Sequence, residues 1–350
     1  MKRCERTMKT FTASEYKLFE QLVGLRQAAL KKVLSNCLKR YYPAVVETGD
    51  YIYCEGTIPI ALVAHMDTVF KDPATEVFYD TRKNVVISPQ GLGADDRAGV
   101  FAILKIVQTG LRPHIIFTTD EEKGCIGADQ LALLECPFDD LRYIIELDRR
   151  GADDCVFYDC DNKEFIKYVE SFGFVEAWGS FTDICCLMSA WGIAGVNLSV
   201  GYRDEHSQHE TLWVGNLLNT IEKVKKMLSV EVKDIPQFEY IESKWSYNKM
   251  WSAACGYDWG DSYGSCGSAL FASTHTCGHC GRHFMWEELI PVFALDKKTT
   301  YYCCDCISSA ATIGWCEKCG NAFNKDVGSD EKFCCYCRGY SHNDNRNSKN

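Results

Sequence analysis

Histidine and acidic side chains, the residue types that bind metal ions and transfer protons, follow several apolar runs of the sequence. The run that ends at Ala64 is followed by His65 and, two residues later, by Asp67. Residues i and i+2 of an extended chain point to the same face, so the Asp67 carboxylate can orient the His65 imidazole. A glycine-rich turn, GLGADDRAG, then places Asp95 and Asp96 at the start of a helical pattern. These segments predict part of a metal site.

Three later groups continue the pattern. The run IIFTT leads into an acidic triplet that ends with Glu121 and Glu122, and the run YIIEL is followed by Asp148. The last strand-like run precedes His206 and Glu210. Each group alone has an ordinary explanation as a helix cap, a solvated turn or an ion pair. Their joint occurrence at strand ends is better explained by a metal site.

In order, the motifs read H-x-D, G-x-G-A-D-D-[KR]-A-G, D-E-E, D and H-x-x-x-E over about residues 50–230. They resemble the co-catalytic di-zinc exopeptidases, which include peptidase T, the aminoacylase-type carboxypeptidases and the zinc aminopeptidases. The segments AHMDTV, GADDRAG and TTDEEKG are most similar to the peptidase T-like branch. The resemblance implies these roles: His65 and Asp148 bind one zinc, Glu122 and His206 bind a second, Asp95 bridges both, Glu121 is the general base and Asp67 orients His65.

Two histidines compete for the last ligand position. In the family pattern, the ligand histidine lies four residues before a glutamate. His206 meets this spacing with Glu210, and His209 is the alternative.

The implied chemistry is hydrolysis of a peptide or amide bond. Two zinc ions that share a water or hydroxide lower its pKa, and a carboxylate such as Glu121 takes its proton and passes it to the leaving amine. We therefore expect a zinc-dependent metallopeptidase or amidohydrolase. An aminopeptidase that hydrolyses small peptides through a metal-bridging hydroxide is the first choice. The alternatives are an N-acyl amino acid amidohydrolase or carboxypeptidase, and a non-enzymatic zinc-ribbon binding protein with a relic hydrolase fold.

The intervals between the motifs are too short for the lid or dimerisation domain that many relatives insert. Only 57 residues separate Asp148 from His206, and 27 separate Asp67 from Asp95. This disfavours a carboxypeptidase or acylase, whose lid residues grip a substrate carboxylate. The nearest candidates for substrate contacts, with structural roles as the alternative, are Thr182, Asp183, Tyr202 and Arg203.

Short apolar runs alternate with helical patterns, which predicts an α/β domain: a three-layer mixed sheet flanked by helices, without a lid. The buried-looking runs IALVA, IIFTT and YIIEL suit its central strands. Strands are expected at 51–54, 58–64, 85–88, 114–118, 143–147, 155–158 and 195–200. Helices are expected at 14–39, 97–109, 127–134, 162–172 and 214–228.

The chain has 21 cysteines, and ten of them lie between Cys277 and Cys337. Two repeats of C-x-x-C-G followed by an aromatic residue and C-C-x-C contain four C-x-x-C pairs, whose eight thiolates are enough for two structural zinc sites, with Cys304 and Cys335 left over. The repeat favours consecutive pairing, and a cross-braced pairing is the alternative. The predicted ligands are Cys277, Cys280, Cys303 and Cys306 in one site, and Cys316, Cys319, Cys334 and Cys337 in the other.

The 350 residues therefore divide into a catalytic domain at 1–230, a linker at 231–275, a tandem zinc-ribbon-like module at 276–340 and a disordered tail at 341–350. The net charge of −10 argues against nucleic acid as a partner. No apolar run reaches membrane-spanning length, and the N-terminal MKRCERTMKT leads into polar sequence rather than an apolar signal segment, so we expect a cytoplasmic protein with no membrane partner. The expected partners are a small peptide or amide substrate and a protein that binds the zinc-ribbon module.

Overall fold

The computed structural model describes residues 9–243 and, further along the chain, Lys332 and the strand residues 275–276, 283–284, 289–293, 299–303, 313–315 and 322–324. The chain divides into two compact units, Met1–Tyr263 and Gly264–Asn350. In the part of the chain that the structure describes, no helix is long and apolar enough to cross a bilayer.

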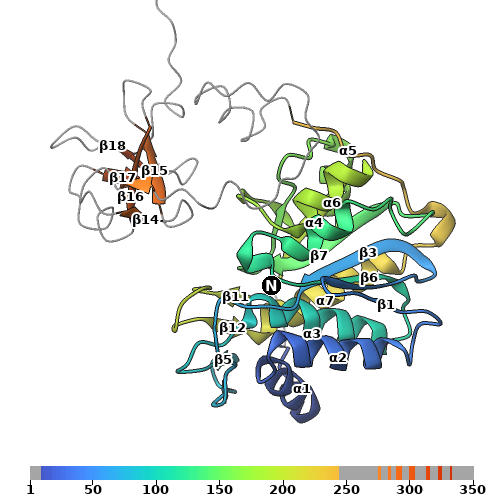
Figure 1. The fold of residues 1–350 in the computed structure, drawn as a ribbon, viewed down its shortest axis with the longest axis horizontal. Helices are drawn as coiled ribbons and strands as arrows, with labels where there is room; N and C mark the ends of the chain where they lie inside the picture. The colour runs from blue at the N-terminus through green and yellow to red at the C-terminus, as the bar shows by residue number, and fades with distance from the viewer. Residues whose placement is uncertain are drawn as a thin grey trace, which may run out of the picture. The chain divides into compact units, whose positions relative to one another are not determined.

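A large mixed sheet forms the centre of the first unit (Figure 1). Its central strands pair in parallel, while an antiparallel strand lies on each side of them. The strand order is β1 (Val46–Glu47), β2 (Tyr51–Cys54), β6 (Pro113–Thr118), β3 (Ile58–His65), β7 (Tyr143–Arg149), β10 (Gly195–Ser199), β8 (Asp154–Val156) and β9 (Val175–Glu176). Every residue of β3 and β6 is buried, as their continuous apolar sequences predict.

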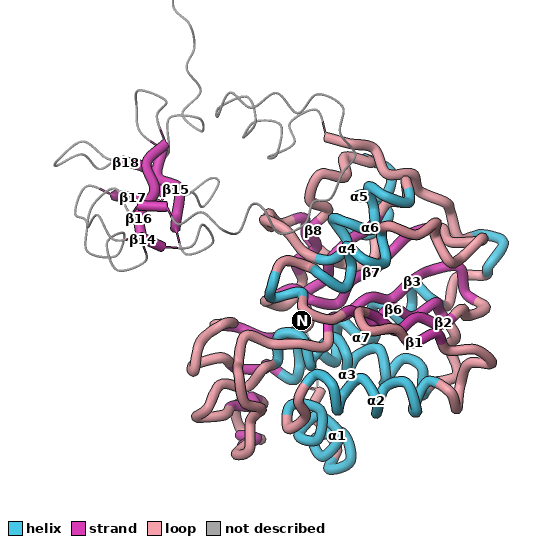
Figure 2. Tube along the Cα trace, in the orientation of Figure 1, coloured by secondary structure: helices cyan, strands magenta, loops and turns pink. Residues whose placement is uncertain are grey.

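Helices cover both faces of this sheet (Figures 1 and 2). One face carries α1 (Ala13–Val23), α2 (Gln27–Leu38), α3 (Ala94–Gln108) and α7 (Val214–Leu228). The other carries α4 (Ile126–Ala132), α5 (Lys163–Glu170) and α6 (Asp183–Trp191). The predicted three-layer architecture is therefore confirmed.

α3 packs closely on β7 because Gly99 has no side chain. A Cβ built at this position would lie 2.0 Å from the carbonyl oxygen of Leu147. The close packing brings the start of α3 next to the end of β7, where Asp95 and Asp148 lie. The glycine of the GADDRAG motif thus helps to assemble the polar end of the sheet.

A smaller antiparallel sheet extends the same unit. Its strands are β11 (Tyr202–Arg203), β12 (Thr211–Trp213), β5 (Val85–Ile87) and β4 (Phe78–Asp80), in that order. The loop between β11 and β12 carries His206.

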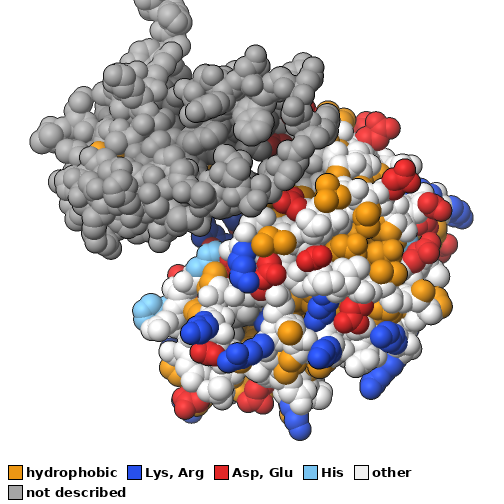
Figure 3. Space-filling view, in the orientation of Figure 1, with side chains coloured by type: hydrophobic (Ala, Val, Ile, Leu, Met, Phe, Trp, Pro, Cys, Tyr) orange, Lys and Arg blue, Asp and Glu red, His pale blue; other side chains and the backbone are white. Residues whose placement is uncertain are grey.

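On the face in view, basic and acidic side chains are interspersed (Figure 3), as is typical of a solvated surface.

The predicted single helix at 14–39 is wrong, because the chain breaks between α1 and α2. Gly24 ends α1, and its amide donates to the carbonyl of Glu20. The carbonyls of Leu22 and Leu25 accept hydrogen bonds from the buried Arg97 of α3, at 3.2 and 3.0 Å. The apolar period continues across the break, so the break could not be predicted from the spacing of the apolar residues.

The sequence reasoning also missed α6. Its sequence, DICCLMSAW, is apolar on nearly every side, so it lacks the polar face that marks an amphipathic helix. Four of its residues are buried: Asp183, Ile184, Leu187 and Met188.

The described start of the predicted linker is part of the first unit. A short 3-10 helix, η2 (Val232–Asp234), is followed by the buried Ile235 and Phe238. Glu239 and Glu242 then form β-bridges with Ile193 and Cys160. The domain limits predicted from the sequence stay predictions, and the tail at 341–350 lies outside the described residues.

The described strands of the second unit form two small sheets. β13 (His275–Thr276) pairs antiparallel with β14 (His283–Phe284). The other sheet has the order β16 (Thr299–Cys303), β15 (Leu289–Phe293), β18 (Ala322–Asn324) and β17 (Ile313–Trp315). Of the eight predicted cysteine ligands, Cys303 falls on a described strand and the other seven lie outside the described residues. The two structural zinc sites stay a prediction.

Candidate active site

The predicted catalytic residues meet at the carboxyl ends of the parallel strands. β3 ends at His65, β6 leads into the 3-10 helix η1 (Glu121–Lys123), and β7 carries Asp148 near its end. Ligands of open α/β sheets bind at this edge. The residues that the structure brings together here are His65, Asp67, Asp95, Glu121, Glu122, Asp148 and His206.

His65 is fully buried among three carboxylates. Its Nδ1 lies 3.1 Å from Asp67 Oδ1, while its Nε2 lies 3.1 Å from Asp95 Oδ1 and 3.5 Å from Asp148 Oδ1. The first contact fixes the ring, because a hydrogen on Nδ1 is donated to Asp67. Nε2 is then available as a metal ligand that faces two acidic groups.

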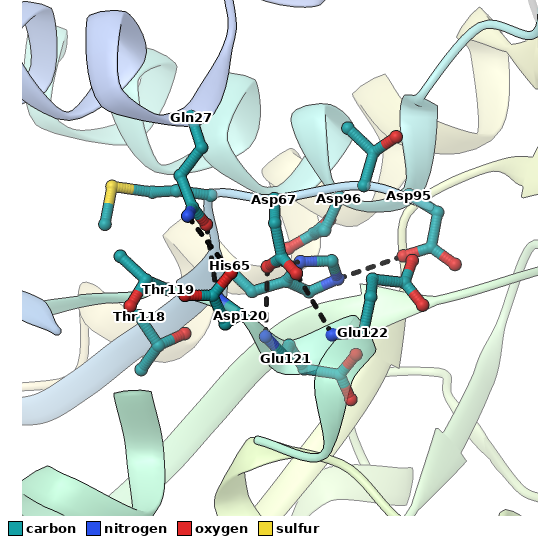
Figure 4. Close-up of polar contacts among 12 residues, drawn as sticks. Gln27, His65, Asp67, Asp95, Asp96, Thr118, Thr119, Asp120, Glu121 and Glu122 are labelled. Atoms are coloured by element: carbon teal, nitrogen blue, oxygen red, sulfur yellow. Dashed lines mark hydrogen bonds and ion pairs between the residues drawn. The ribbon is translucent and has the colours of Figure 1, made fainter. Parts of the chain in front are cut away.

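Asp67 also holds the segment that carries the candidate base. Its Oδ1 accepts a hydrogen bond from the backbone amide of Glu121 at 3.0 Å, and its Oδ2 accepts one from Glu122 at 3.1 Å (Figure 4). Burial raises the pKa of Asp67, but the hydrogen bonds from His65 and from these amides outweigh it and hold the pKa below its usual value. One ionised carboxylate thus joins the H-x-D and D-E-E motifs.

Asp95 spans two groups of ligands. Its Oδ1 faces His65, and its Oδ2 lies 3.3 Å from Nε2 of His206. The same Nε2 lies 3.0 Å from Oε2 of Glu122. Hydrogen bonds to Asp95 and Glu122 raise the pKa of His206 to about 11, so this point of the site attracts positive charge.

These residues fit a pair of zinc ions. The donor atoms of His65, Asp95 and Asp148 lie within 4.8 Å of one another, and so do those of Asp95, Glu122 and His206. Asp95 is common to both sets, which is the geometry that a bridging carboxylate needs. The buried Oε1 of Glu122 has no hydrogen-bond partner among the described residues. Histidine nitrogen and carboxylate oxygen are donors that zinc accepts.

The carboxylates that crowd this site repel one another. Burial and the neighbouring Asp95 raise the pKa of Asp148 to about 7. Burial, followed by the charges of Asp148 and other acidic groups, also raises the pKa of Glu121 well above its usual value. A dication held between these groups would relieve both effects.

Glu210 fixes the turn that leads to Asp95. Its buried carboxylate accepts hydrogen bonds from the amides of Gly93 at 2.6 Å and of Asp95 at 2.9 Å. Burial raises the pKa of Glu210 to about 8 against these hydrogen bonds. The glutamate of the H-x-x-x-E motif therefore holds the backbone of the GLGADDRAG turn by hydrogen bonds.

Two positioning residues escaped the sequence reasoning. Arg97 is buried and donates to the carbonyls of Met66 and Asp67, next to His65. Gln27 of α2 exchanges two hydrogen bonds with Asp120, at 3.3 and 3.1 Å, and so holds the start of the D-E-E segment (Figure 4). Arg97 belongs to the GADDRAG motif and could have been noticed, whereas nothing in the sequence links Gln27 to Asp120.

The candidate substrate contacts divide into two kinds. Thr182 and Tyr202 line the pocket described below, but each donates a hydrogen bond to Asp148, at 3.1 and 3.0 Å. Asp183 is buried and accepts from Thr118. The guanidinium of Arg203 lies over the ring of Trp213. For Asp183 and Arg203, these contacts favour a structural role over contact with the substrate.

The alternative ligand His209 is absent from the groups of possible metal ligands among the described residues, and one of these groups contains His206. The choice of ligand remains a proposal.

A pocket of about 130 Å³ opens onto the acidic cluster. It is lined by Asp95, Glu121, Asp148, Arg149, Arg150, Tyr158, Gly179, Ser180, Phe181, Thr182, Asn197, Tyr202, Glu205 and His206.

Residues 54–169 match the model of peptidase family M28. The matched segment contains six of the seven predicted catalytic residues, and His206 lies beyond it. Peptidases of family M28 are zinc-dependent. A comparison with curated proteins gave no match.

Solved structures of two aminopeptidases and a tripeptidase are similar in fold to this chain. Aminopeptidase PepT from Bacillus cereus aligns with a TM-score of 0.52 and 16% identity, over 63% of this chain and 98% of that chain. A tripeptidase from Staphylococcus aureus gives 0.53 and 14%, over 63% and 98%. A TET aminopeptidase from a marine sediment archaeon of the Thaumarchaeota gives 0.52 and 13%, over 63% and 99%. At these identities, the likeness establishes the fold.

Proposed function

We propose that this protein is a zinc-dependent metallopeptidase, and that it acts as an aminopeptidase on small peptides. The observation that carries the proposal is the position of Asp95, whose two oxygens face two sets of candidate ligands. The match to peptidase family M28 supports a metallopeptidase hydrolase. The names of its structural neighbours, an aminopeptidase and a tripeptidase, suggest the class of substrate.

The proposed ligands are those that the motifs implied. His65 and Asp148 would hold one zinc ion, Glu122 and His206 a second, and Asp95 both. Bound zinc would polarise the carbonyl of the scissile bond and lower the pKa of the attacking water.

Glu121 is the proposed general base. It lines the pocket, and its backbone is fixed by the hydrogen bond to Asp67. Its carboxylate accepts a proton from water while the oxygen attacks the carbonyl carbon. It then donates this proton to the amine as the carbon–nitrogen bond breaks. Burial raises the pKa of Glu121 and makes it a better proton acceptor than an exposed glutamate.

Two further expectations concern the cysteine-rich second unit and the location of the protein in the cell. We propose that the eight cysteines bind two structural zinc ions and that the zinc-ribbon module binds a protein partner. The cytoplasmic location rests on the sequence and stays a prediction.

A zinc count combined with an activity screen tests the proposal. We expect about four zinc ions per chain, two co-catalytic and two structural. Peptides with a free amino terminus should be cleaved, N-acylated peptides should not, and a chelator should abolish cleavage. If none of the peptides and N-acyl amino acids tested is hydrolysed by zinc-loaded protein, the enzymatic assignment is wrong.

A further inference from the structure

Two arginines in the pocket wall follow the proposed ligand Asp148 directly. Nη1 of Arg150 lies 2.7 Å from Oε1 of Glu205, and this ion pair is exposed, with 57% of the arginine side chain accessible. Arg149 is different. It is half-buried, and among the described residues its one side-chain hydrogen bond runs from Nη2 to the carbonyl of Trp178, at 2.9 Å.

The Nε of Arg149 is buried without a hydrogen-bond partner among the described residues. No carboxylate in that part of the chain forms an ion pair with this guanidinium, whereas Arg150 has Glu205. A guanidinium carries five N–H donors, and leaving a buried one unpaired costs free energy. Nη1 also forms no hydrogen bond among the described residues, so the guanidinium has donors left for an acceptor that a ligand supplies.

The loop that follows β9 holds this guanidinium in place. The carbonyl of Trp178 accepts its hydrogen bond, and the next residue, Gly179, passes close to the sheet. A Cβ at Gly179 would lie 2.9 Å from Cγ1 of Val156 and 3.0 Å from Cε1 of Tyr158. The backbone of this loop is thus packed against the sheet, so Arg149 is oriented before a ligand arrives.

The pocket that Arg149 lines is rich in acidic residues. Apart from Arg149, Arg150 and His206, the charged residues that line it are acidic: Asp95, Glu121, Asp148 and Glu205. A substrate carboxylate that enters would be repelled by these groups unless a cation received it. The planar fork of arginine matches a carboxylate with two parallel hydrogen bonds.

We propose that Arg149 binds a carboxylate of the substrate and makes the enzyme selective for peptides that place such a group in the pocket. This inference rests on the proposed function. In a pocket of about 130 Å³, the C-terminal carboxylate of a short peptide is the expected source, and an acidic side chain would be the other.

The test compares acids with amides in the zinc-loaded full-length protein. Alanyl-alanine and trialanine are assayed beside their C-terminal amides. The wild type should cleave the acids roughly 10- to 100-fold more efficiently, through a lower KM, which is the range for a hydrogen bond to a charged group. Arg149→Gln should remove this preference, so that each acid and its amide are cleaved with equal efficiency. Arg149→Lys, which keeps the charge but loses the fork, should retain part of it.

Arg203→Gln is the matched control, because Arg203 is an arginine near the site that packs on Trp213 and does not line the pocket. It should keep the full preference. A third substrate, alanyl-aspartic acid α-amide, separates the two sources. Rapid cleavage of this amide, as fast as that of alanyl-alanine, would assign the carboxylate to the side chain.

Equal cleavage of acids and amides by the wild type would overturn the inference. So would an equal loss on both in Arg149→Gln, since a purely structural role predicts it. Calorimetric binding of alanyl-alanine and its amide to the Glu121→Gln protein gives a readout without turnover. If alanyl-alanine binds more tightly than its amide, and this difference is lost on adding Arg149→Gln, the inference is supported. It is then supported even if no peptide is cleaved, because the absence of cleavage would refute only the proposed function. No difference in binding between acid and amide refutes the inference.

Discussion

Replacing Asp67 with asparagine removes the charge at the junction of the two central motifs. In the structure, Oδ1 of Asp67 receives His65 Nδ1 and the Glu121 amide, and Oδ2 receives the Glu122 amide. Asparagine has one carbonyl oxygen and one NH2 group. If the oxygen takes the Oδ1 position, the NH2 group faces the N–H of Glu122, so one hydrogen bond is lost and two donors confront each other.

The lost interaction sets the size of the effect. A hydrogen bond to a charged group contributes about 1.5–3 kcal/mol, and loss of a partner of a metal-binding histidine costs about 10- to 100-fold in metal affinity or activity. We therefore expect Asp67→Asn to lower kcat/KM by about 10- to 100-fold and to weaken zinc binding at His65. The change should appear in kcat as well as in zinc affinity, because the segment that carries Glu121 and Glu122 loses the hydrogen bond at the Glu122 amide.

The assay measures peptide hydrolysis and zinc content on the same samples, with Asp72→Asn as control. Asp72 forms an exposed ion pair with Arg26, in which both side chains are about 70% accessible, so its loss should change neither quantity. If Asp67→Asn binds zinc and turns over as the wild type does, Asp67 does not orient His65 and Glu121.

Other changes test the remaining parts of the site. Glu121→Gln should keep the zinc but lose nearly all turnover, and an active variant would show that another group is the base. Glu210→Gln replaces one of the two oxygens that hold the turn before Asp95, so zinc affinity should fall; unchanged affinity in a zinc titration would contradict this role. Arg97→Met leaves four backbone carbonyls without their donor, and we expect the free energy of unfolding to fall by several kcal/mol, measured in urea, because each buried unpaired acceptor costs about 1–3 kcal/mol. Burial lowers the pKa of His114 despite Asp140, so His114 favours the fold when neutral; its contribution is present above the unfolded pKa of about 6.5 and is lost as the pH falls below it toward the folded pKa. Unfolding measured from pH 7 to 5 should therefore show a steeper loss in the wild type than in His114→Asn, and parallel curves would refute it.

The candidate site residues that gather at this edge of the sheet were predictable because their types follow the strands in a fixed order. His65, Glu122 and Asp148 each lie at or just after the end of a buried run, and parallel strands bring such ends to one edge. The strands themselves were predictable from continuous apolar runs such as IALVA and YIIEL.

The rest depends on partners that are distant in the chain. Gln27 meets Asp120 across 93 residues, and Arg97 meets the α1–α2 junction across 75. Arg149 is equally ambiguous in the sequence, because LDRRG does not tell which arginine forms an ion pair and which forms none within the described part of the chain. That distinction needs the position of Glu205, in a loop that follows another strand.

Diffraction at the zinc absorption edge, from crystals of the zinc-loaded full-length protein, tests the central claim most directly. We expect two anomalous peaks on either side of the Asp95 carboxylate, roughly 3.5–4 Å apart. One should lie beside His65 and Asp148, and the other beside Glu122 and His206. A single peak, or none next to Asp95, would contradict the two-metal site.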